Sequence, residues 1–392
     1  MIDNVLYEFM EEQLRQTPTF FHRYKYNEVD WNGRLTGIVG PRGVGKSTMV
    51  LQYILEHREE GHHLYVTADS TYFSTHTLVG LARDFVQNAG THLYIDEVHK
   101  YSGWSRELKE IYDSHPGLKV TFTGSSVMEI TRGEADLSRR AVMEVMQGLS
   151  FREYLQLCHG IELPVYDLED ILAHRVTLPQ ELLHPLPYFR QYLADGYYPF
   201  AREGRFVTRM LQIVNQTIEV DIMQYANMKA TTARKLKQML MTITSLTPFK
   251  PNVSHLAREI GVSMNNVPDY LLLLEKAGML GQLRDDTAGL VGLGKVEKIY
   301  LDNPSLMTAL SIGNPNLGNL RETFFYNQMR VRYPIVNSRQ SDFCISPYTF
   351  EVGGPKKGRK QIENIENGFV VRDDIEYGSN IFIPLWHFGL TY

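Results

Sequence analysis

The chain has 392 residues, with 40 lysine and arginine residues against 45 aspartate and glutamate residues and a formal net charge of -5. This balance excludes a global positive field that would drive binding to nucleic acids or membranes. Only two cysteines occur, far apart in the sequence, which excludes a disulfide framework and a thiolate zinc site. Because the apolar runs are too short to span a membrane and the first residues do not resemble a signal peptide, we expect a cytoplasmic protein with no membrane partner.

Residues 40–47, Gly-Pro-Arg-Gly-Val-Gly-Lys-Ser, match the phosphate-binding pattern G-x-x-x-x-G-K-[ST] at every fixed position. A short apolar strand is expected over residues 34–39 before the loop, and a helix from Thr48 after it. Glycines let the backbone approach a phosphate closely, so that successive N–H groups point at one anion. We expect Lys46 to neutralise the β- and γ-phosphates of ATP, and the Ser47 hydroxyl to bind Mg²⁺. The predicted nucleotide-binding residues are Gly40, Pro41, Arg42, Gly43, Val44, Gly45, Lys46, Ser47 and Thr48.

About fifty residues later, an apolar strand over residues 91–95 ends in the carboxylates of Asp96 and Glu97. This is the Walker B arrangement. The carboxyl ends of parallel strands line the ligand crevice of an open sheet, so Asp96 should lie beside Ser47 and hold the metal ion. Glu97 is the candidate general base for the attacking water. A solvated acidic pair at a strand end is the alternative interpretation.

A later strand, expected over residues 118–122, leads into Ser125 and Ser126. Either serine could orient the attacking water, and capping of the next helix is an equally good and compatible role. Strands expected over residues 64–68 and 141–145 complete the sheet. Arg139 and Arg140 are candidate arginine fingers, in cis or from a neighbouring subunit of a homo-oligomer, because phosphoryl transfer requires a cation at the developing charge. A surface pair of arginines is the alternative.

The order of these segments resembles that of a known family, the AAA-type predicted ATPases of bacteria and archaea. The resemblance rests on the phosphate loop, the Asp-Glu and Thr-Gly-Ser-Ser strand ends, Leu-Ser-Arg-Arg at 137–140 and Leu-Ser-Phe-Arg-Glu-Tyr at 149–154. It continues through Tyr-Leu-Ala-Asp-Gly-Tyr-Tyr-Pro at 192–199 and the Ser-Asp-Phe and Phe-Glu-Val segments at 341–343 and 350–352. The resemblance implies ATP binding and hydrolysis, followed by a region of unassigned function, and it supplies no substrate.

The middle of the chain predicts a winged helix. Residues 253–260 and a second helix ending at Ala277 flank Gly261, which is typical of a helix-turn-helix, and residues 295–301 could form the strand after a wing. Two basic and three acidic side chains lie between residues 253 and 283, a local net charge of -1, which favours protein docking or a structural role over DNA binding. DNA contact stays open through Asn265, Asn266 and Tyr270.

The resemblance also implies a C-terminal module similar to the restriction-endonuclease core, whose site is an Asp followed by Glu-x-Lys on the next strand. Asp342 and Glu351 stand in this order, and Glu322 on a preceding helix is the candidate third carboxylate. Position 353, which shares a strand face with Glu351, is glycine instead of lysine. A nearby lysine could replace it, or the fold is retained for packing or for nucleic-acid contact. The nearby basic residues are Lys356, Lys357, Arg359 and Lys360.

We therefore expect an α/β protein with three parts. These are a P-loop NTPase domain of AAA type with a parallel sheet over residues 1–155, a helical connector over 156–305 with the winged helix at about 250–305, and a nuclease-like α/β module over 306–392. The main hypothesis is Mg²⁺-dependent ATP binding and hydrolysis coupled to conformational change of the C-terminal domains. The alternatives are a nucleotide-gated switch that binds protein or DNA with little turnover, and an ATP-regulated nuclease with a degenerate site.

Overall fold

The computed structural model describes residues 3–124, 137, 139–223, 230–246, 250, 252–286 and 294–392. The chain divides into two compact units, Met1–Gln147 and Gly148–Tyr392. Among the described residues, no helix combines the length and the apolar character needed to cross a membrane.

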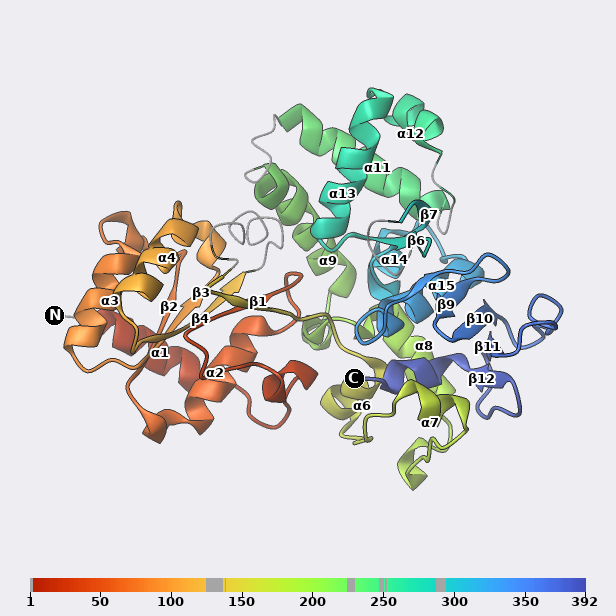
Figure 1. Cartoon of the computed structure of the whole chain (residues 1–392), viewed down its shortest axis with the longest axis horizontal. Coiled ribbons are helices and arrows are strands. Elements are labelled where there is room, and N and C mark those ends of the chain that lie inside the picture. Colours follow the sequence, from red (N-terminus) through yellow and green to blue (C-terminus); the bar gives the residue numbers. More distant parts are fainter. Residues whose placement is uncertain are drawn as a thin grey trace. The chain divides into compact units, whose positions relative to one another are not determined.

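The N-terminal unit is built on a five-stranded sheet in the order β2-β3-β4-β1-β5, in which every pair of neighbouring strands is parallel. Figure 1 shows α1 and α2 on one face of this sheet and α3 and α4 on the other. Strands covered on both faces are rich in apolar residues, and four of these five are almost entirely buried. The strands are β1 (Leu35–Val39), β2 (His63–Thr67), β3 (His92–Asp96), β4 (Lys119–Gly124) and β5 (Val142–Val145). The helices are α1 (Asn4–Gln16), α2 (Lys46–Glu56), α3 (Leu78–Gln87) and α4 (Trp104–Ser114).

The strand order places the functional loops. From β1 the chain crosses to β2 at one edge of the sheet, then returns through β3 and β4 and passes β1 to reach β5, so the connections that leave β1 and β4 run in opposite directions. In open parallel sheets, ligands bind outside the carboxyl ends of the strands at such a reversal. The carboxyl ends of β1, β3 and β4 therefore lie at one edge of the sheet.

The first part of the C-terminal unit is helical. It contains α6 (Phe151–His159), α7 (Leu168–Leu172), α8 (Leu186–Gln191), α9 (Phe206–Gln216), α11 (Ala230–Leu246), α12 (Val253–Ile260) and α13 (Val267–Lys276), with π-helical turns at Tyr192–Gly196 and Thr217–Ile222. Ser150 begins α6 with a capping box: its hydroxyl accepts a bond from the Glu153 N–H, and the Glu153 carboxylate accepts one from the Ser150 N–H. Phe151, Phe189, Tyr192 and Phe324 make edge-to-face contacts at the centre of this unit.

The helices α12 and α13 are joined through Gly261, which has a φ of +63°. An antiparallel pair follows them, formed by β6 (Leu280–Arg284) and β7 (Val296–Leu301). These elements lie where the sequence predicts them, and their interpretation as a winged helix stays a prediction. One expectation is wrong: Tyr270 is only 7% exposed, because its ring lies on the packed face of α13, so it is not available to contact DNA.

The last part of the chain forms a mixed five-stranded sheet in the order β12-β11-β10-β9-β8. β10, β11 and β12 are mutually parallel, whereas β8, β9 and β10 pair antiparallel. The elements are α14 (Pro304–Leu310), α15 (Leu317–Met329), β8 (Val336–Asn337), β9 (Phe343–Ile345), β10 (Tyr348–Gly353), β11 (Gly368–Arg372), β12 (Phe382–Pro384) and a final 3-10 helix, Leu385–Leu390. Phe325 of α15 packs on Phe343, Phe350 and Phe388, which joins this helix to the sheet and to the final 3-10 helix.

Candidate nucleotide-binding site

The phosphate loop joins β1 to α2, and its backbone requires glycine. Gly40, Gly43 and Gly45 have φ values of +155°, +77° and +97°. A Cβ atom on Gly40 would lie 2.1 Å from the carbonyl oxygen of Met146, so no other residue fits there without a backbone shift. Gly45 is the N-cap of α2, and the helix begins at Lys46, two residues earlier than expected. The first N–H groups of α2 have no partner within the helix and are available to an anion bound in the loop.

Lys46 lies folded over this loop. Its side-chain nitrogen donates to the carbonyl oxygens of Gly40 at 2.8 Å and of Pro41 at 2.7 Å, and the residue is only 6% exposed. Burial lowers the pKa of Lys46 to about 8, although the negative charges of Asp96 and Glu97 oppose this shift. The ammonium group therefore lies in the loop, bonded to two carbonyl oxygens that phosphate oxygens could replace.

Ser47 and Asp96 meet at the end of the loop, as the sequence predicts. The Ser47 hydroxyl lies 2.8 Å and 2.9 Å from the two carboxylate oxygens of Asp96, which ends β3. The hydroxyl of Thr123 on the neighbouring strand β4 also donates to Asp96. Two hydroxyl groups and a carboxylate thus converge beside the buried ammonium group of Lys46.

Glu97 follows Asp96 with its backbone in the left-handed region, at φ +49°. Its N–H donates to the Thr123 hydroxyl at 3.1 Å, which holds the backbone, and its side chain turns toward the phosphate loop. There its carboxylate lies 3.2 Å from the Arg42 guanidinium group, with the two side chains 27% and 17% exposed. A non-glycine residue in this conformation at the end of a central strand is typical of functional sites.

Two contributors to this site were missed by the sequence analysis. Thr123 bonds to both Walker B residues, and its position at the end of a strand next to β3 was a signal that could have identified it. Arg23 is 5% exposed and donates to the carbonyl oxygen of Val44 in the loop and, at 2.8 Å, to that of Gln147. Nothing in the local sequence around Arg23 indicates this long-range role.

The remaining predicted residues of this site are not brought to the loop by the described contacts. Ser125 and Ser126 lie outside the described residues. Arg139 is exposed. The guanidinium group of Arg140 forms two bonds of 2.9 Å and 3.0 Å to Asp113 at the end of α4.

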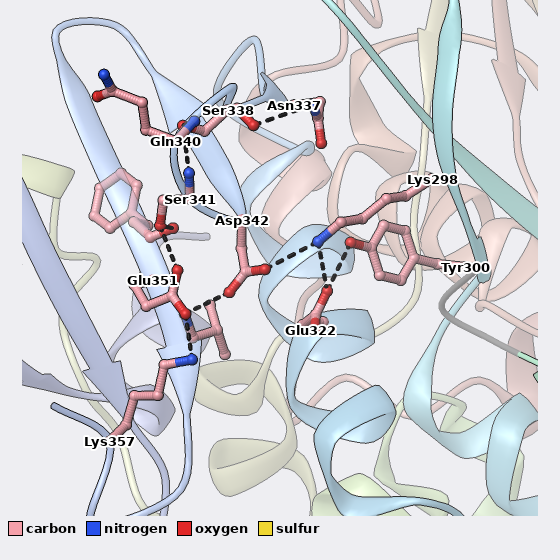
Figure 2. Close-up of polar contacts among 12 residues, drawn as sticks. Lys298, Tyr300, Glu322, Asn337, Ser338, Gln340, Ser341, Asp342, Glu351 and Lys357 are labelled. Carbon is pink, nitrogen blue, oxygen red and sulfur yellow. Dashed lines mark hydrogen bonds and ion pairs between the residues drawn. The ribbon is translucent and has the colours of Figure 1, made fainter. Parts of the chain in front are cut away.

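The three carboxylates of the expected C-terminal site do come together, as Figure 2 shows. Glu322 projects from α15, Asp342 precedes β9, and Glu351 lies on β10. Lysines contact all three: Lys298 lies 2.9 Å from Asp342 and 3.2 Å from Glu322, while Lys357 pairs with Glu351. Lys357 was one of the lysines expected near Glu351, and Lys298 was not anticipated. The other three basic residues of the loop, Lys356, Arg359 and Lys360, are exposed.

Comparison with known proteins finds similarity over most of the N-terminal unit and part of the C-terminal one. Residues 32–155 match the model of the AAA domain. This region has the P-loop NTPase fold and is similar to AAA domains. Residues 186–317 match a domain of unknown function, DUF8612. The match to the AAA domain agrees with the parallel five-stranded sheet and with the loop geometry described above.

The chain is also similar to an uncharacterized protein of Methanocaldococcus jannaschii, with 24% identity over 406 residues that cover 92% of this chain and 85% of that protein. Among solved structures, it is similar to a Walker-type ATPase of Pyrococcus abyssi, with a TM-score of 0.44, 15% identity, and coverage of 77% of this chain and 95% of that one. RuvB of Thermotoga maritima gives a TM-score of 0.31, 14% identity, and coverage of 71% and 87%.

Proposed function

We propose that this protein binds ATP with Mg²⁺ and hydrolyses it in the cytoplasm, and that hydrolysis drives conformational change in the C-terminal part of the chain. The observation that carries the proposal is the meeting of Ser47, Asp96 and the buried Lys46 at the end of a glycine loop in an AAA domain. The coupled parts would be the helical connector over 156–305 and the nuclease-like module over 306–392 proposed from the sequence.

The donor set suits Mg²⁺, which prefers hard oxygen ligands. The Ser47 hydroxyl and the Asp96 carboxylate would hold the ion, Asp96 through water, with the Thr123 hydroxyl orienting the carboxylate. When bound, Mg²⁺ would neutralise charge on the β- and γ-phosphates.

The protein's own groups carry the remaining steps. The N–H groups of the loop and of the first turn of α2 bind the phosphate oxygens, and Lys46 exchanges its carbonyl partners, Gly40 and Pro41, for the same oxygens. Glu97 accepts the proton of the attacking water after its carboxylate leaves Arg42. Ser125 as the water-orienting residue, and Arg139 or Arg140 as the arginine finger in a homo-oligomer, are part of this proposal on sequence grounds alone.

A nucleotide-gated switch that binds another protein is the second candidate function. One surface favours it: the exposed side of α13 and of the turn before it presents Met264, 56% exposed, Leu272, 42% exposed, and the acidic Asp269. Apolar and acidic side chains suit a protein partner better than the phosphate backbone of DNA, which requires positive charge. In this case the AAA domain would bind ATP and turn it over slowly.

The test is a paired measurement of Mg²⁺-dependent ATP binding and of phosphate release by the wild type and by Lys46→Met. Charge-assisted hydrogen bonds are worth about 1.5–3 kcal/mol, so the variant should bind ATP roughly 10- to 150-fold more weakly. Lys109→Met, on the exposed side of α4, is the matched control and should behave as wild type. Unchanged binding in Lys46→Met would overturn the proposal.

Repeating the phosphate-release assay with single- and double-stranded DNA identifies the partner class. Stimulation by DNA would favour a nucleic-acid partner for the C-terminal part. Indifference to DNA would favour a protein partner, as the exposed surface of α13 suggests.

A further inference from the structure

The carboxylate cluster of the C-terminal unit contains three acidic and two basic side chains. Figure 2 shows Glu322, Asp342 and Glu351 with Lys298 and Lys357 among them. All five are at least two-thirds buried: the side-chain exposed fractions are 18%, 16% and 1% for the acids and 26% and 31% for the lysines. Charges withdrawn from water to this degree require partners, and here each carboxylate has a lysine.

Lys298 lies between two of the carboxylates. Its nitrogen is 2.9 Å from an oxygen of Asp342 and 3.2 Å from an oxygen of Glu322. Tyr300, two residues along β7 and therefore on the same face of the strand, donates to the same Glu322 oxygen at 3.0 Å. Burial alone would lower the pKa of Lys298, but Glu322 and Asp342 together raise it above its ordinary value.

The second oxygen of Asp342 and both oxygens of Glu351 are also engaged. The second Asp342 oxygen accepts the N–H of Val352 at 3.0 Å. Glu351 accepts the Ser341 hydroxyl at 2.6 Å and pairs with Lys357. Among the residues that the structure describes, no group of three or more His, Cys, Asp and Glu side chains is arranged to hold a metal ion.

We propose that Lys298 takes the place of a divalent cation between Glu322 and Asp342, so that the cluster is an internal ion-pair lock and not a metal site. A divalent cation held by both carboxylates would lie about 2.0–2.6 Å from an oxygen of each. The Lys298 ammonium group already lies within hydrogen-bonding distance of those oxygens, and two positive groups so close together repel each other strongly.

Two consequences follow for this unit. The cluster does not supply the metal-dependent cleavage that the order of Asp342 and Glu351 suggests, because its residues do not fit the cation that such chemistry requires. Instead, Lys298 joins the β6–β7 pair to α15 and to the sheet through Glu322 and Asp342. This conclusion is independent of the proposed ATPase activity.

The test measures Mn²⁺ binding to the full-length, nucleotide-free protein, by loss of the free Mn²⁺ signal in electron paramagnetic resonance. Lys298→Met removes the ammonium group and retains the length of the side chain. This variant should bind one more Mn²⁺ ion per chain than wild type, and Mn²⁺ should raise its melting temperature more than that of wild type. Lys298→Arg retains the positive charge and should bind no additional ion.

Asp342→Asn in both backgrounds distinguishes the outcomes. In Lys298→Met it should abolish the additional ion, whereas in the wild-type background it should leave Mn²⁺ binding unchanged. Loss of Mn²⁺ on Asp342→Asn in otherwise wild-type protein would show a native cation site and overturn the proposal, even if Lys298→Met did not fold. A folded Lys298→Met with no additional ion would also overturn it, because Lys298 would then not be what excludes the cation.

Discussion

Replacement of Glu97 by glutamine tests the proposed chemistry with little disturbance of the fold. Glutamine has the same shape, and its side-chain oxygen can still accept a hydrogen bond from Arg42, which lies 3.2 Å from the Glu97 carboxylate. The pair is partly exposed, at 17% and 27%, so its loss should change the free energy of unfolding by less than about 1 kcal/mol. The Glu97 N–H bond to Thr123 belongs to the backbone and is retained.

The expected loss of rate is much larger. A positioned general base contributes roughly 10²- to 10⁴-fold, or about 2.7–5.4 kcal/mol of activation free energy, and glutamine cannot accept the proton. Glu97→Gln should therefore bind ATP as wild type does and release phosphate at least about a hundredfold more slowly in a single-turnover assay.

A matched control is Glu110→Gln, on the exposed side of α4, which should retain wild-type turnover. Turnover by Glu97→Gln within about fivefold of wild type, a difference of roughly 1 kcal/mol in activation free energy, would refute the assignment of Glu97 as the base. Loss of ATP binding would instead give Glu97 a role in holding the nucleotide.

Thr123→Val removes the hydroxyl that donates to Asp96 and accepts the Glu97 N–H. We expect slower phosphate release and a free energy of unfolding in urea that is lower by about 1–3 kcal/mol. An unchanged rate and an unchanged free energy of unfolding would contradict this role. Ser150→Ala breaks the capping box with Glu153 and should cost about 1–2 kcal/mol in the same measurement, with no change predicted in ATP affinity. Burial lowers the pKa of His387 from its ordinary value of 6.5 to about 3 in the folded protein. Below pH 6.5 the unfolded chain therefore binds a proton that the folded protein does not, and the free energy of unfolding falls progressively as the pH decreases toward 3. Between pH 7 and 5, wild type should lose about 2 kcal/mol more than His387→Gln in urea titrations, and equal losses would show that His387 does not titrate on unfolding.

The sequence predicted the local parts of the nucleotide site well. Glycines at positions 40, 43 and 45 have the positive φ values that the loop pattern requires, and the lysine and serine follow at fixed spacing. The strands before and after the loop were expected from short apolar runs, and the structure has them within one or two residues. These features depend on neighbours along the chain, so a single sequence contains the information that determines them.

Prediction from the sequence was less accurate for residues whose role depends on which face of a helix is exposed or on a partner far away in the chain. Tyr270 was considered for DNA contact, but its ring packs inside because helical periodicity directs that side of α13 toward the core. Arg23 contacts Val44 and Gln147, the second of which lies 124 residues away. The residues next to Arg23 in the sequence do not predict such a contact.

What the sequence by itself determined is the chemistry available to this protein: a loop able to bind phosphate, a strand that ends in two carboxylates, and three acidic residues in the order of a nuclease site. Only the tertiary structure decided how these groups are partnered. Strand order brings Thr123 to Asp96, and the β6–β7 pair brings Lys298 to Glu322 and Asp342, 24 and 44 residues away. The physical reason is that buried charges take whatever partners packing places beside them, and packing is a property of the whole fold.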